Sequence, residues 1–121
     1  MESYHNYQQL TTKLQTWASQ HPQLVRLKSL GKSPEGREYW ILTMTDFQSG
    51  EDSHKPAMWV DANTHAGEVC GTEVVLHLIE KLLRDFSNQK DIQNLLRLCA
   101  FYFLPRISVD GAELYLQTPH F

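Results

Sequence analysis

His65 and Glu68 are the residues of this sequence whose types and spacing best suit chemistry at a metal ion. A neutral imidazole and a carboxylate suit zinc, and a catalytic zinc takes three protein ligands and leaves a fourth position for water. In the HExxH arrangement the Glu beside the first His is a base, whereas this spacing would make Glu68 a ligand. The structural alternative is a loop histidine beside a glutamate that a helix dipole stabilises. The spacing leaves both interpretations open.

A second pair with the same spacing, His77 and Glu80, shows that spacing alone is a weak signal. These two residues share the polar face of an expected helix with Glu73 and Lys81, which is typical of a solvated charge cluster. We therefore interpret the second pair as structural. The place of each His and Glu pair in the expected fold must therefore decide which pair is the better candidate site.

The apolar pattern predicts short helices and strands joined by loops. Apolar residues recur at helical spacing from Tyr7 to Trp17, and His21 and Pro22 end that helix. Two runs rich in branched and aromatic residues, 24–30 and 38–44, predict a hairpin with a longer loop. The remaining expected elements are a compact apolar strand at 57–60, an amphipathic helix at 68–86, a turn at 88–94 and a buried strand at 99–104.

The order of strand, helix and buried strand in the second half predicts a parallel α/β unit. Open α/β sheets bind ligands beyond the carboxyl ends of their strands. Residues 61–68 and 105–111 are therefore expected to meet at one edge of the sheet. This position favours His65 and Glu68 over the mid-helix pair as the candidate site.

Other polar residues of these two segments have possible supporting roles. Asp61 and Asn63 could hydrogen-bond the His65 imidazole and fix its tautomer, or they could cap the turn. Asp110 and Gly111 are a turn signal. Arg106 is a cation near the expected ligand crevice, and a surface position is the alternative for it.

Composition excludes several classes of partner. The 121 residues carry a formal charge of -3 without a cluster of Lys and Arg, so neither nucleic acid nor an anionic membrane surface is expected. The longest apolar run, 98–104, is far shorter than the ~18 residues of a spanning helix. The first twenty residues lack the apolar core of a secretory signal, so the expected location is cytoplasmic. Cys70 and Cys99 are interpreted as two buried free thiols, with a disulfide as the alternative.

The sequence resembles the N-terminal part of the zinc carboxypeptidases of the carboxypeptidase A type, over about residues 4–119. The segments that follow the family's order are Tyr4 and His5, His21 and Pro22, GKSPEGR at 31–37, and PAMWVD at 56–61 leading to HAGE at 65–68. The stretch from 105 to 111 is similar to the family's Asn-Pro-Asp-Gly turn, although Ser108 and Val109 stand where Asn and Pro are usual.

The resemblance implies that His65 and Glu68 are zinc ligands and that the family reaction removes C-terminal residues from peptides. The metal would polarise the scissile carbonyl and activate a water. The family's third ligand, a His, its general-base Glu and its substrate-binding Arg and Tyr residues are expected downstream, and His120 matches none of them. Gly67 stands where pancreatic-type members have Arg. The 121-residue chain is therefore expected to be inactive alone.

The implied fold is α/β: the N-terminal portion of a three-layer α/β/α sandwich with a mixed, mainly parallel-core sheet. Residues 1–121 would form one incomplete catalytic domain. An uncovered sheet edge is expected at 101–104 and predicts self-association of the isolated chain. Two alternative functions stay open: a zinc-dependent deacylase of N-acyl amino acids with a related fold, and a catalytically dead short module for binding or regulation.

Overall fold

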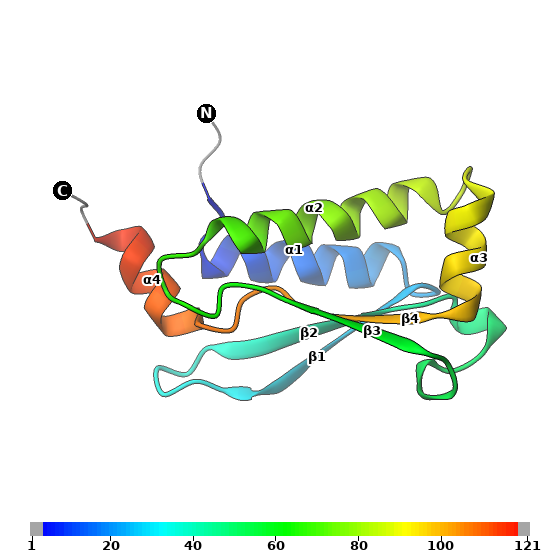
Figure 1. The fold of residues 1–121 in the computed structure, drawn as a ribbon. Coiled ribbons are helices and arrows are strands. Elements are labelled where there is room, and N and C mark those ends of the chain that lie inside the picture. The colour runs from blue at the N-terminus through cyan, green and yellow to red at the C-terminus, as the bar shows by residue number, and fades with distance from the viewer. Residues whose placement is uncertain (1–3, 119–121) are drawn as a thin grey trace.

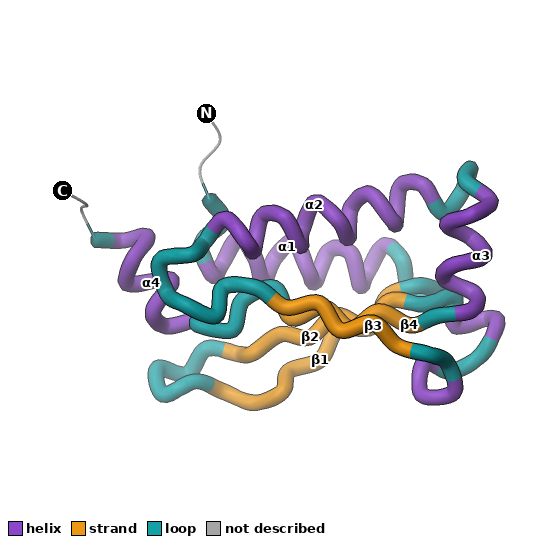
Figure 2. The backbone as a smooth tube through the Cα atoms, in the orientation of Figure 1, coloured by secondary structure: helices purple, strands orange, loops and turns teal. Residues whose placement is uncertain are grey.

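The computed structural model describes residues 4–118 and confirms the expected alternation of helices and strands. Its elements are α1 (Tyr7–Gln20), β1 (Val25–Lys32), β2 (Glu38–Met44), β3 (Ala57–Asp61), α2 (Cys70–Asp85), α3 (Lys90–Leu98), β4 (Ala100–Leu104) and α4 (Val109–Gln117) (Figure 1). Two short 3-10 turns, Phe47–Ser49 and Asp52–His54, lie between β2 and β3. Figure 2 shows that a loop also joins β3 to α2.

The four strands form one mixed sheet in the order β1, β2, β4, β3. β1 and β2 are antiparallel, as are β2 and β4, whereas β3 and β4 are parallel with Asp61 opposite Leu104. The parallel pair is the predicted strand, helix and strand unit, and α2 and α3 form its connection. The α/β fold class with a mixed sheet is therefore confirmed.

The helices α1 and α2 lie on the same side of the sheet (Figure 1). Their buried apolar side chains join those of β2 and β4 in one core. On the opposite side of the sheet, Figure 1 shows no helix from residues 4–118. The described part of the chain thus contains two of the three layers of the expected sandwich.

The first helix follows from local capping and from its apolar spacing. The side chain of Asn6 accepts a hydrogen bond from the Gln9 backbone, and the Gln9 side chain accepts one from the Asn6 backbone. This capping box satisfies two backbone donors at the helix start. Leu10, Leu14 and Trp17 then face the core.

The second helix presents the predicted apolar stripe to the sheet. Its buried residues are Thr72, Val75, Leu76, Ile79, Leu82 and Leu83. α2 begins at Cys70, so Glu68 lies in the loop before it and not in its first turn as predicted. With 16 residues, α2 is the longest described helix, and no helix within residues 4–118 is long and apolar enough to cross a membrane.

Three local predictions are wrong. The expected turn at 88–94 is largely the helix α3, in which Ile92, Leu95 and Leu96 supply one apolar face at helical spacing. Asp110 and Gly111 lie in the first turn of α4 and not in a free turn, because the chain continues helically from Val109. Cys70 is exposed and Cys99 is half-buried, so the expected burial of the two cysteines is wrong, whereas both thiols are free as expected.

The prediction that 101–104 forms an uncovered edge is also wrong. β4 lies between β2 and β3, so its backbone is paired on both sides. The edge strands are β1 and β3, and in β3 Met58 is 56% exposed and Trp59 is 51% exposed. Both segments are short apolar runs in the sequence, and only the strand order distinguishes a central strand from an edge strand.

Candidate metal centre

The two expected metal ligands face each other in the loop between β3 and α2. The Nδ1 atom of His65 lies 2.9 Å from Oε1 of Glu68. A backbone hydrogen bond from Glu68 N to His65 O, 3.0 Å long, closes the turn that brings them together. The side chains are 81% and 63% exposed, so both are open to solvent.

The chemistry and separation of these atoms fit two ligands of a zinc ion. Two atoms bound to one tetrahedral zinc at ~2.0–2.2 Å lie about 3.4 Å apart. The observed 2.9 Å is close to that value, and exposed side chains can open by the remaining distance. Within residues 4–118, no group of three or more His, Cys, Asp or Glu side chains is placed to hold a metal ion. His120 lies outside the described residues.

Residues 61–68 and 105–111 meet beyond the carboxyl ends of β3 and β4, as the parallel arrangement requires. The backbone of Ile107 donates to Ala62 O over 3.0 Å, and the backbone of Ser108 donates to Asn63 O over 2.9 Å. The strand pairing therefore continues past both strand ends into the loop. The candidate ligands are carried on a segment whose first residues are fixed to the chain that follows β4.

Asn63 holds the backbone of this loop. Its φ of 60° is in the left-handed region, which Asn tolerates better than most residues. Its Nδ2 donates to the carbonyl oxygens of His65 (2.8 Å) and Ala66 (3.4 Å). Of the two roles expected for Asn63, the contacts match the turn cap, because they reach the backbone of His65 and not its ring.

Asp61 ends β3 and is directed elsewhere in this structure. Its Oδ2 accepts a hydrogen bond from Nε1 of Trp59 over 2.8 Å. Strand alternation places these two side chains on the same face of the sheet. The expected hydrogen bond between the His65 imidazole and the Asp61 carboxylate stays a prediction.

Arg106 is buried, which rules out the surface position considered for it. It lies two residues after the end of β4 and is 1% exposed. Its Nε donates to Oδ1 of Asn63 over 2.7 Å. Burial lowers the pKa of Arg106, while the negative charges of Glu113 and Glu73 act in the opposite direction. No spacing in the sequence indicated that this cation lies beneath the metal loop, the segment of residues 62–69 that carries the candidate ligands.

The start of α4 supports the loop from the other side. Asp110 accepts hydrogen bonds from Ser33 Oγ (2.7 Å), Arg37 Nη1 (3.0 Å) and the Glu35 backbone (3.2 Å). Burial raises the pKa of the Asp110 carboxyl, but these hydrogen bonds outweigh burial and lower it. The resemblance marked both segments, yet it did not indicate that Asp110 ties α4 to the turn between β1 and β2.

Two close approaches between α4 and the loop were not indicated by the sequence. A Cβ added to Gly111 would lie 2.7 Å from Cβ of Ala66, so glycine is needed for this contact. A Cβ added to Gly67 would lie 3.3 Å from the Tyr115 ring. The ring of Tyr115 therefore lies where the first atoms of a side chain at position 67 would be.

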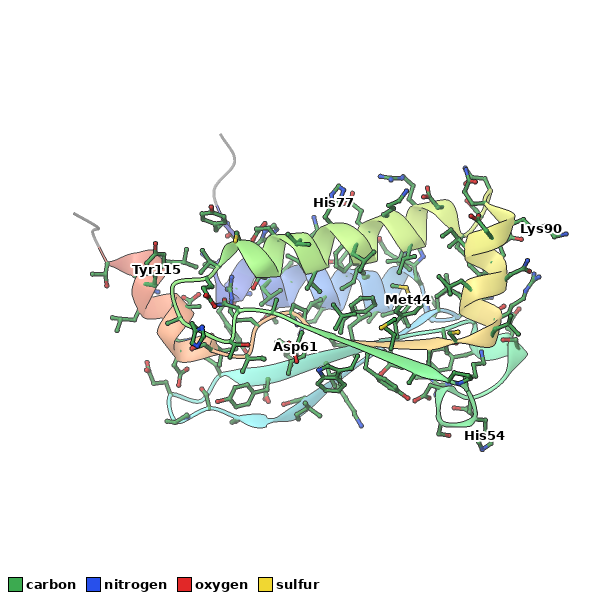
Figure 3. The ribbon with its side chains drawn as sticks, in the orientation of Figure 1. Met44, His54, Asp61, His77, Lys90 and Tyr115 are labelled. Carbon is green, nitrogen blue, oxygen red and sulfur yellow. The ribbon has the colours of Figure 1, made fainter. Side chains whose placement is uncertain are left out.

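The second His and Glu pair lies away from the site. Figure 3 shows His77 on the outer face of α2, directed away from the sheet. His77 and Glu80 are both exposed, as predicted. Glu73, expected in the same solvated cluster, is half-buried and accepts a hydrogen bond from the backbone of His5, whose Nδ1 lies 2.7 Å from its carboxylate.

The chain has relatives among the carboxypeptidases. It is 33% identical over 118 residues to a zinc carboxypeptidase of Saccharothrix mutabilis subsp. capreolus. This alignment covers 98% of this chain and 27% of the relative. It is 31% identical over 110 residues to carboxypeptidase D of Mus musculus, covering 91% of this chain and 8% of that protein. The chain thus spans about a quarter or less of these relatives.

Solved structures share the fold. The crystal structure of thrombin activatable fibrinolysis inhibitor superposes with a TM-score of 0.85 at 24% identity, over 96% of this chain and 28% of that one. Carboxypeptidase A of Helicoverpa armigera gives a TM-score of 0.76 at 28% identity, over 91% and 26% of the two chains. The family model described as zinc carboxypeptidase matches residues 10–120. The chain therefore belongs to the zinc carboxypeptidase family.

Proposed function

We propose that His65 and Glu68 are two of the three protein ligands of a catalytic zinc, in a protein that hydrolyses C-terminal residues from peptides. The observation that carries this proposal is the approach of His65 Nδ1 to Glu68 Oε1, at 2.9 Å, beyond the carboxyl ends of two parallel strands. Family membership supports the reaction class. When bound, the zinc supplies polarisation of the scissile carbonyl and activation of a water.

The residues of this chain would prepare the site for that reaction in three ways. His65 and Glu68 present their donor atoms to solvent, where a metal and a peptide can reach them. Asn63 fixes the backbone on which His65 lies. Gly67 carries no side chain beside the ligand pair, and the Tyr115 ring lies over it.

Zinc binding by the 121-residue chain tests the metal assignment. We expect weak binding of one zinc ion, because a catalytic zinc takes three protein ligands and this pair supplies two. The His65→Ala variant should lose that binding, measured by competition with a chromophoric chelator. His77→Ala is the matched control, since it removes an exposed histidine from a pair with the same spacing. Unchanged zinc affinity in His65→Ala would remove the metal assignment.

The reaction class needs a protein with the complete ligand set. The intact mass of the endogenous product, measured after immunocapture, shows whether the chain occurs within a longer protein. That longer protein should release the terminal residue from a peptide with a free carboxyl end and leave the corresponding peptide amide intact. Faster release of acyl groups from N-acyl amino acids would favour the deacylase. An endogenous mass equal to the 14.1 kDa of this chain would favour the binding module.

A further inference from the structure

Arg106 is a buried cation whose terminal nitrogens lack hydrogen-bond partners. Its side chain is 1% exposed, and within residues 4–118 neither Nη1 nor Nη2 has a hydrogen-bond partner. A buried charge is costly unless it is paired, so a cation at this position needs a specific reason. The structure offers one directional contact, from Nε to Oδ1 of Asn63 at 2.7 Å.

The carboxylates near Arg106 are engaged by other groups. Glu73 and Glu113 are the negative charges that act on the guanidinium. Glu73 accepts the backbone N–H of His5, and Glu113 accepts the backbone N–H of Tyr7. The carboxylate oxygens of these two residues therefore bind the backbone of the segment that leads into α1. The two carboxylates balance the charge of Arg106, while its directional hydrogen bond goes to the metal loop.

That hydrogen bond fixes which way the Asn63 amide points. A guanidinium can only donate, so the amide must present its oxygen to Arg106 and its nitrogen to the opposite side. On that side Nδ2 donates to the carbonyl oxygens of His65 and Ala66. Thr72 Oγ1 also donates to Asn63 Oδ1, over 3.4 Å, and to Pro105 O, over 2.7 Å. The guanidinium is thus linked to the peptide groups of the loop through a single oriented amide.

We propose that Arg106 is a positioning residue for the metal loop: it orients the Asn63 amide, which holds the peptide groups of His65 and Ala66 so that His65 and Glu68 face one point. The inference rests on the proposed zinc-binding role of these two ligands. Arg106 itself lies beneath the loop and needs no contact with metal or substrate.

A double-mutant cycle in the 121-residue chain tests the pathway. Arg106→Met removes the charge at similar length, and Asn63→Gly removes the amide while tolerating the positive φ. Each should weaken zinc binding by about ten- to hundredfold, the usual effect of removing a group that orients a metal ligand. The double variant should bind zinc as tightly as the single variant that has the lower affinity, because both changes break the same link. Multiplicative losses would overturn the proposal.

The control is Thr45→Ala, which disturbs a buried polar residue at the other end of the sheet. Thr45 Oγ1 donates to the carbonyl oxygens of Leu96 and Cys99, near the start of β4. This variant should lower the melting temperature and leave the zinc affinity of the folded chain unchanged. A loss of affinity equal to that of Arg106→Met would show a general effect of lower stability and would overturn the proposal.

Amide hydrogen exchange without metal separates this inference from the proposed function. In Arg106→Met and Asn63→Gly, the backbone amides of Glu68, which donates to His65 O, and of Ser108, which donates to Asn63 O, should exchange at least tenfold faster than in the wild type, and in Thr45→Ala they should not. If the wild-type chain binds no zinc at His65 but this pattern holds, the function fails and the positioning role stands. Unchanged exchange in both loop variants would overturn the positioning role. Asn63→Gly keeps the test decisive if Arg106→Met does not fold.

Discussion

β3 and β4 are neighbouring parallel strands of similar length and composition, yet they contribute differently to the candidate site. β4 is paired on both sides, and Phe103 lies fully within the core. The chain leaves β4 through Pro105 into the buried Arg106. β3 is an edge strand with an exposed Trp59, and the chain leaves it toward the exposed His65.

The segment after β4 supports the loop, whereas the segment after β3 carries the candidate ligands. Burial and hydrogen bonding on the β4 side fix the backbone beneath the loop, so changes there should cost stability and loop order together. The segment after β3 exposes His65 and Glu68 to solvent, where their side chains contribute little to the stability of the fold. Substitutions on the two strands should therefore give effects of very different size.

The largest effect is expected from Phe103→Ala in β4. Phe103 stacks on Phe101 with ring centroids 5.7 Å apart, and both belong to the main core. The cavity left by truncation should lower the free energy of unfolding by about 3–5 kcal/mol, measured by urea denaturation. Phe103→Leu keeps more of the volume and should cost less. A loss below 1 kcal/mol for the alanine variant would contradict the contrast between the strands.

Gly111→Ala should have the next largest effect, because it pushes α4 against the metal loop. The added Cβ would lie 2.7 Å from Ala66 Cβ and 2.9 Å from Ser108 Oγ. Overpacking of this kind costs about 1–3 kcal/mol of stability, and we expect weaker zinc binding with it. Leu114→Ala, at an exposed position of the same helix, is the control. Equal melting temperatures for the two variants would show that the close approach of α4 to the loop does not affect stability.

Asp110 gives the support a pH dependence. The lowered pKa of its carboxyl means that its stabilising contribution is present above the pKa of the unfolded chain and is lost as pH falls through the folded pKa. Asp110→Ala should therefore cost about 1–2 kcal/mol at pH 7, and clearly less near pH 3. The exposed Glu80→Ala serves as the control. A cost for Asp110→Ala that is equal at both pH values would contradict this assignment.

The smallest effect on stability is expected from Trp59→Lys in the edge strand. Because Trp59 is half exposed, the substitution should change the free energy of unfolding by about 0.5 kcal/mol or less. A charge on an unpaired edge opposes pairing with another chain. We expect the wild-type chain to self-associate through β3 at high concentration, and the variant to do so less, in light scattering. A monomeric wild type would remove the prediction of self-association.

Much of the fold could be predicted because periodicity reports local geometry. Helical spacing predicts α1, and branched and aromatic runs predict β1 and β2. The stripe on α2 predicts which of its faces is buried. The helix α3 was missed because its short polar start resembles a turn, and the helix α4 was missed because Asp followed by Gly near its start is also a turn signal.

The sequence by itself determined the order of the elements from α1 to β4 apart from α3, the family resemblance, and the prediction that favours His65 and Glu68 over His77 and Glu80. Only the tertiary structure decided that β3 lies at an edge of the sheet and β4 inside it, that Arg106 is buried beneath the loop, and that Asn63 links Arg106 to the loop. The physical reason is that periodicity records which side of its own element a residue occupies. Burial, strand order and the partners of a polar group depend on contacts between residues far apart in the chain, such as the 43 positions that separate Asn63 from Arg106.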